Sequence, residues 1–115
     1  MPREATASAR HPDENHVARL ARFFPAAVPV RLPIRLSPMG VADTRLENTI
    51  IEFSTTREVL FACTQPLEFG AQIRLQNSDG SLDVEASVVA LQYNDGQTAV
   101  AARFSKEVPN WIVKP

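Results

Sequence analysis

The sequence predicts a mainly β chain that folds as a six-stranded antiparallel barrel, and two Asp-Gly pairs give the first indication. Asp79-Gly80 and Asp95-Gly96 each lie between runs in which apolar and polar residues alternate. Asp-Gly favours the tight type I′ turn of a β-hairpin, because both central residues of that turn need a positive φ. Between the pairs, every second residue from Leu82 to Ala90 is apolar, which is the period of a strand. The second half of the chain is therefore expected to be an antiparallel meander with these residues on its inner face.

The N-terminal part of the chain is expected to contain a polar tail, one short helix and the first strand. Residues 1–12 are polar and show no periodicity, which predicts a disordered tail. Glu14–Phe24, with Asp13 as its N-cap, carries its apolar residues on one helical face and ends before Pro25. Val28–Ser37 alternates strictly, and the two prolines on its polar face predict an edge strand, or a strand paired on one side only there.

Five further strands complete the predicted barrel, and all four glycines fall at the turns around them. The expected strands are Arg45–Phe53, Glu58–Cys63, Ala71–Gln76, Ser81–Tyr93 and Thr98–Ser105. In the first of these, Thr49, Ile51 and Phe53 are expected on one face. In the last, Val100, Ala102 and Phe104 form the inner face. Val108–Pro115 holds the only tryptophan, Trp111, and is expected to form one helical turn that closes one end of the barrel. Closure removes sheet edges that would otherwise recruit other chains.

Length and composition limit the classes of function. The 115 residues are expected to form one domain over 13–115, with the barrel itself over 28–105. A net charge of −1 argues against non-specific nucleic-acid binding. The chain has no apolar run of about 18 residues and no signal-peptide pattern, so we expect a cytoplasmic protein without a membrane span. The single cysteine, Cys63, excludes an internal disulfide and is expected to pack as a small hydrophobe.

The sequence contains no pattern that indicates catalysis or metal binding. It has no glycine-rich phosphate loop after a strand, no zinc-ligand spacing and no nucleophile elbow. Its two histidines, His11 and His16, lie in a polar N-terminal stretch, far in sequence from Cys63. We therefore expect a protein that is not an enzyme and has no metal ion or cofactor.

The arginines of the first strand are the most interesting polar residues. Arg31 and Arg35 are four apart on a strand, so both lie on the face opposite the apolar one. With Arg19 or Arg22 of the preceding helix, they could form a patch for a planar anionic ligand, because guanidinium groups bind phosphate in a bidentate manner and stack on bases. The alternative, which the residues alone favour, is that these arginines only keep an outer sheet face soluble.

The segment Asn48–Leu75 resembles the PilZ domain family, and the likeness continues through Leu82–Leu91 and Ala99–Phe104. It covers roughly residues 22–105, in the order strand, turn, strand, Pro-Leu-x-x-Gly loop and long hairpin. The resemblance implies a six-stranded barrel from a bacterial regulatory protein that responds to cyclic di-GMP.

Two motifs hold the dinucleotide in the family that the chain resembles. The first is Arg-x-x-x-Arg ahead of the first strand. At that place the chain has Arg22, but Ala26 stands where the second arginine is expected. Arg31-Leu-Pro-Ile-Arg35 has the required spacing, but it lies within the predicted strand. The second, Asp/Asn-x-Ser-x-x-Gly, falls on Phe53–Glu58 and puts Thr55 at the serine position. A shift of one residue puts Glu52 and Ser54 at the acidic and serine positions instead.

These observations leave two hypotheses for the function. In the first, the barrel binds cyclic di-GMP on its outer face and signals to a partner protein. The ligand-binding residues would be Arg22, Arg31, Arg35, Ser54, Thr55 and Arg57. In the second, the barrel has lost nucleotide binding and acts as a ligand-independent protein-interaction module. Its docking segments would be the N-terminal tail and Trp111–Val113, and a homodimer could form through the proline-bearing edge. A salt bridge from Glu58 to Arg31 or Arg35 would favour the second hypothesis.

Overall fold

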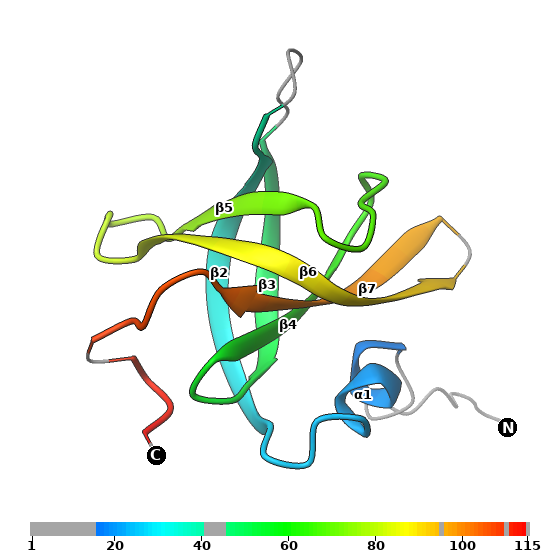
Figure 1. Ribbon diagram of the computed structural model, residues 1–115, viewed down its shortest axis with the longest axis horizontal. Coiled ribbons are helices and arrows are strands. Elements are labelled where there is room, and N and C mark those ends of the chain that lie inside the picture. The colour runs from blue at the N-terminus through cyan, green and yellow to red at the C-terminus, as the bar shows by residue number, and fades with distance from the viewer. Residues whose placement is uncertain (1–15, 41–45, 95, 110, 115) are drawn as a thin grey trace, which may run out of the picture.

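Six antiparallel strands close into a barrel, and one short helix packs against the outside (Figure 1). The computed structural model describes residues 16–40, 46–94, 96–109 and 111–114. The elements are α1 (His16–Ala21), β2 (Val28–Pro38), β3 (Glu47–Ser54), β4 (Glu58–Cys63), β5 (Gln72–Gln76), β6 (Asp83–Asn94) and β7 (Gln97–Phe104). Around the barrel the strands follow the order β2-β3-β4-β7-β6-β5, and β5 pairs with β2 to complete the ring. The predicted fold class is confirmed.

The interior of the barrel is filled by side chains from every strand. The residues predicted for the inner face of β7 all belong to this core, as does Val88 of β6. The fully buried apolar side chains include Leu36, Ile51, Phe61, Ile73, Leu75, Val88 and Val100. Alternation along a strand places successive side chains on opposite faces, so each strand contributes one apolar face to this core.

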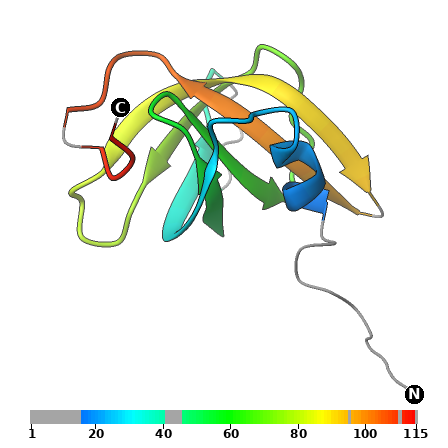
Figure 2. The same cartoon turned by 90° about the horizontal axis from the view of Figure 1, so that it is seen from below.

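Helix α1 lies against the outside of the barrel (Figure 2), and a second apolar cluster lies beneath it. Val17 and Leu20 of the helix pack against Leu60 of β4 and against Ala99 and Ala101 of β7. The small alanines allow the helix to approach the sheet closely. The predicted apolar helix face is confirmed, although the helix ends at Ala21, before Phe24. The predicted N-terminal tail and helix start lie outside the described residues.

Strand β2 shows how the barrel accommodates two prolines. Pro29 and Pro33 pair with β3 alone, whereas β5 pairs only with the segment from Arg35 to Pro38. Proline has no N–H to donate, so a strand with one neighbour over this stretch tolerates it. Of the two predicted arrangements, pairing on one side only at the prolines is therefore confirmed. Arg31 and Arg35 are exposed, as the alternation predicts.

Irregular register in β3 and β6 overturns two predictions about which face a residue occupies. The pairing shifts between Ile51 and Phe53 and again between Val88 and Ala90. Each shift is consistent with a β-bulge, which reverses the side-chain alternation beyond it. Phe53 and Ala90, predicted to face the same way as Ile51 and Val88, instead pack against the outer cluster under α1. Leu91 packs against the interior in place of Ala90.

The two Asp-Gly pairs lie in connections of different length. Asn94 pairs with Gln97, which confirms the predicted hairpin between β6 and β7, and Gly96 has a φ of +82°. Asp95 lies outside the described residues. The other connection spans residues 77–82. Its ends are joined because the Asn77 side-chain oxygen accepts a hydrogen bond from the Leu82 backbone N–H at 2.9 Å. The predicted hairpin is confirmed by the pairing of β5 with β6, whereas the two-residue turn predicted at Asp79-Gly80 is wrong, since an asparagine-capped loop replaces it.

The C-terminal segment closes one end of the barrel without a helical turn among its described residues, 108–109 and 111–114. Trp111 is buried within the barrel core and meets Phe104 edge to face, with ring centroids 5.1 Å apart. The predicted closing role of Trp111 is confirmed, whereas the predicted helical turn is not seen among the described residues of this segment.

Candidate functional site

The six residues predicted to hold a ligand lie in three places. Arg22 directly follows α1, Arg31 and Arg35 lie on the outer face of β2, and Ser54–Arg57 spans the turn from β3 to β4. Val28 pairs with Ser54, whereas Arg35 pairs with Asn48 at the other end of β3. At strand rise, Arg35 therefore lies about 23 Å along β2 from the turn, and Arg31 about 10 Å. The structure does not bring Arg35 together with the turn.

The hydroxyl of Ser54 faces the interior of the protein. Ser54 is fully buried, and its Oγ lies 2.8 Å from the Thr55 carbonyl oxygen and 3.0 Å from the Glu58 carbonyl oxygen. It also accepts a hydrogen bond from the indole N–H of Trp111 at 2.9 Å. These partners occupy the donor and an acceptor position of the hydroxyl, which ties the turn to the C-terminal segment.

The hydroxyl of Thr55 organises the turn itself. Its Oγ1 accepts hydrogen bonds from the backbone N–H groups of Arg57, at 3.0 Å, and Glu58, at 2.8 Å. It donates in return to Oε1 of the Glu58 carboxylate. Threonine hydroxyls commonly bond the backbone two or three residues ahead in such turns. Thr55 is buried as well, so both predicted hydroxyl ligands serve the local structure.

Glu58 forms its ion pair with a residue that the sequence analysis did not select. Its Oε2 accepts hydrogen bonds from Nε and Nη2 of Arg103, each at 2.9 Å. Arg103 lies directly opposite Glu58 in the pairing of β4 with β7. Its outward position between two inward residues, Ala102 and Phe104, was readable from the alternation. Among the described residues, Glu58 forms no ion pair with Arg31 or Arg35.

The linker after α1 meets this turn and forms a small hollow with it. The hollow, of about 410 Å³, is lined by the linker residues 23–26, by the turn residues 55–58 and by Arg103. Phe23 is 76% exposed at its rim, and Arg57 is exposed as well. Arg22 is exposed at the start of the same linker. The structure thus brings the linker close to Thr55 and Arg57 and adds Arg103 to them.

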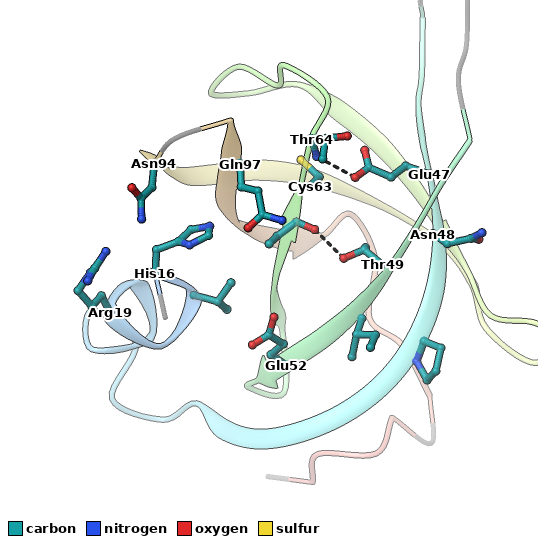
Figure 3. A pocket seen from close by; sticks show the side chains of 14 residues that line it. His16, Arg19, Glu47, Asn48, Thr49, Glu52, Cys63, Thr64, Asn94 and Gln97 are labelled. Atoms are coloured by element: carbon teal, nitrogen blue, oxygen red, sulfur yellow. Dashed lines mark hydrogen bonds between the residues drawn. The ribbon is translucent and has the colours of Figure 1, made fainter. Parts of the chain in front are cut away.

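A larger hollow, of about 970 Å³, opens between α1 and the strands β3 and β4 (Figure 3). Several of its polar groups hold the two strands together. Oε2 of Glu47 accepts a hydrogen bond from the Thr64 backbone N–H at 2.7 Å, and the Thr49 hydroxyl donates to the Ala62 carbonyl at 2.6 Å. His16 points into this hollow, and its buried Nε2 has no hydrogen-bond partner among the residues that the structure describes.

Cys63 lines the same hollow without the properties of a nucleophile. The thiol is 1% exposed and donates a weak hydrogen bond to the Gln65 carbonyl at 3.5 Å. Burial raises the pKa of Cys63 to about 11, and the negative charge of Glu47 acts in the same direction. The thiolate is the reactive form of cysteine, so this group stays inert at neutral pH. The expectation that Cys63 packs as a small hydrophobe is confirmed, although the residue is fully buried where half-burial was expected.

Within the described ranges, no group of three or more histidine, cysteine or acidic side chains is placed to hold a metal ion. In the same part of the chain, no helix has both the length and the apolar character needed to cross a membrane. No protein-family model and no curated protein sequence matches this chain.

Proposed function

We propose that this chain is a PilZ-like regulatory module that acts through contact with a partner protein and does not depend on cyclic di-GMP. One observation carries this choice between the two hypotheses. The hydroxyls of Ser54 and Thr55, the candidates for the serine of the ligand motif, are buried and bonded within the protein. A ligand would have to break these bonds before it could use either group.

The charges around the turn support the same choice. The carboxylate of Glu58 lies where the family motif has glycine, and a carboxylate near a phosphate raises the energy of the bound state. Arg103 already neutralises this carboxylate at 2.9 Å, so one of the two arginines that line the hollow is partly engaged. Ala26, in the linker that lines the hollow, lacks the guanidinium that the first motif requires.

Exposed apolar side chains at the same end of the barrel favour contact with a protein. Phe23 is 76% exposed and lies beside Pro25 at the rim of the linker hollow. An aromatic ring held on a short linker and flanked by arginine is typical of the centre of a protein interface. The interaction surface proposed here consists of Phe23, Pro25, Arg57 and Arg103.

Nucleotide sensing remains the second candidate, because Arg57 and Arg103 share a hollow with the linker that follows Arg22. Isothermal titration with cyclic di-GMP distinguishes the two functions. We expect no binding heat at tens of micromolar ligand, while a PilZ protein with both motifs intact gives a full isotherm under the same conditions. Saturable heat that disappears in Arg57→Ala and Arg103→Ala would overturn the ligand-independent function.

Contact with a partner is tested by affinity capture from a lysate with a matched pair of variants. Phe23 and Phe69 are equally exposed, at 76%, and Phe69 lies in the loop between β4 and β5. We expect Phe23→Ser to lose the captured protein and Phe69→Ser to retain it. Equal capture by both variants would show that the linker face is not the interaction surface.

A further inference from the structure

A second hollow adjoins the interaction surface on the side of the C-terminal segment. It measures about 530 Å³ and lies between the β3–β4 turn, the end of β7 and residues within 105–109 and 111–114. Figure 1 shows the C-terminal segment leaving the end of β7 on the side of this turn, and the bond from Trp111 to Ser54 holds it there. Thr56, Arg57 and Arg103 line both hollows, so the two adjoin at these residues.

The lining of this second hollow is strongly cationic. Arg57, Arg103, Lys106 and Lys114 contribute four positive charges, against the carboxylate of Glu107 and that of Glu58, which pairs with Arg103. The whole chain carries a net charge of −1, so this density of positive charge is local. Within the described part of the chain, Arg57, Lys106 and Lys114 form no ion pair. Only the Nε and Nη2 groups of Arg103 bond Glu58, which leaves N–H donors of its guanidinium for another acceptor.

We propose that this cationic hollow binds an acidic peptide segment of the partner protein, with an apolar residue of that segment against Phe23. The proposal rests on the proposed function of protein contact and names the chemistry of the partner. The cations of the hollow come from a turn, a strand and the C-terminal segment, so they are spread over its lining. An extended peptide can present carboxylates at several points along its length and so can pair with more than one of these cations. The adjoining exposed phenylalanine supplies the apolar contact that gives such a charged interface its affinity.

The turn is poorly suited to a phosphate group. Proteins usually hold phosphates with backbone N–H groups that point outward from a loop or a helix end. Here the N–H groups of Arg57 and Glu58 both point inward to Thr55 Oγ1. Nucleic acid is disfavoured by the small size of the patch and by the acidic balance of the chain. Side-chain cations beside a turn whose Arg57 and Glu58 N–H groups are already bonded favour carboxylates as the ligand.

Fluorescence anisotropy with a labelled peptide of repeated Glu-Glu-Leu units tests the proposal. We expect saturable binding that weakens as salt is added, because the ion pairs are at the surface. Lys106→Glu and Lys114→Glu are each expected to weaken binding about tenfold, which corresponds to ~1.4 kcal/mol. Arg35→Glu, the same change of charge on the far part of β2, is expected to leave the affinity unchanged.

Three outcomes would overturn the acidic-segment proposal. The first is absence of binding, and the second is equal binding of a Lys-Lys-Leu peptide. The third is displacement of the acidic peptide by inorganic phosphate at ionic strengths where chloride has no effect, because the hollow would then be a phosphate site. None of these outcomes revives nucleotide sensing, which is decided separately by the titration with cyclic di-GMP.

Discussion

Trp111 donates its indole N–H to the hydroxyl of Ser54, 2.9 Å away, across an interval of 57 residues. The same N–H lies 3.2 Å from the Thr55 carbonyl oxygen, so the ring anchors the C-terminal segment to the β3–β4 turn. Both partners are buried, which places this polar contact inside the closed end of the barrel. Trp111 is therefore a structural residue, and its role is to hold two walls of the cationic hollow in place.

Trp111→Phe is expected to lower the free energy of unfolding by about 1–3 kcal/mol, because it keeps an aromatic ring but leaves a buried hydroxyl without its donor. Trp111→Ala is expected to lower it by about 3–5 kcal/mol through the cavity that it creates. Urea unfolding followed by circular dichroism measures both. Ile112→Ala is the control, since Ile112 is 53% exposed next to the tryptophan. If Trp111→Phe is as stable as this control, the bond to Ser54 contributes nothing.

Thr55→Val tests whether the turn depends on the threonine hydroxyl. The substitution keeps the shape of the side chain and removes the acceptor for the N–H groups of Arg57 and Glu58. We expect a loss of about 1–3 kcal/mol in the free energy of unfolding, as for other unsatisfied buried donors. Thr55→Ser is expected to retain most of the stability. Thr56→Val alters an exposed neighbour and is expected to have little effect; a loss equal to that of Thr55→Val would contradict the role of the hydroxyl.

The architecture was predictable because it depends on local patterns. Alternation marks the strands, and glycines with positive φ mark their ends, as Gly80 and Gly96 illustrate. The faces of Phe53 and Ala90 were not predictable, since a shift in register is defined by the partner strand rather than by the strand itself. Where alternation is broken, a single strand read alone gives the wrong face for every residue beyond the break.

The candidate site was predictable in part. A turn rich in hydroxyl groups was found from the sequence, and so was the nearby Arg57. That Ser54 bonds Trp111, and that Glu58 pairs with Arg103, follows only from tertiary pairings across 57 and 45 residues. A hydroxyl at a motif position looks the same in sequence whether it faces a ligand or the interior, so its role could be assigned only once its partners were known.

Val88→Asp tests the assignment of inside and outside in β6. Val88 is 1% exposed within the barrel core, so the substitution buries a carboxylate that has no partner. We expect the domain to unfold, with loss of the β-sheet signal in circular dichroism. Val28→Asp introduces the same group on a residue that is 43% exposed at the start of β2, and it is expected to remain folded. A folded and monomeric Val88→Asp variant would refute the assignment of the inner face.

Because of Cys63, the free energy of unfolding is expected to fall as the pH rises through the alkaline range. Burial, with a contribution from the Glu47 carboxylate, raises the pKa of the thiol from 9.0 to about 11. The unfolded chain therefore loses this proton at a lower pH than the folded chain does. The free energy of unfolding is unaffected by this group below its unfolded pKa and falls as the pH rises from about 9 to about 11.

Urea midpoints of the wild type and of Cys63→Ala across this range isolate the effect, because every other titrating group is common to both. The alanine variant is expected to be less stable at neutral pH, with a shallower decline above pH 9, and parallel curves would show that the thiol does not titrate as its burial requires.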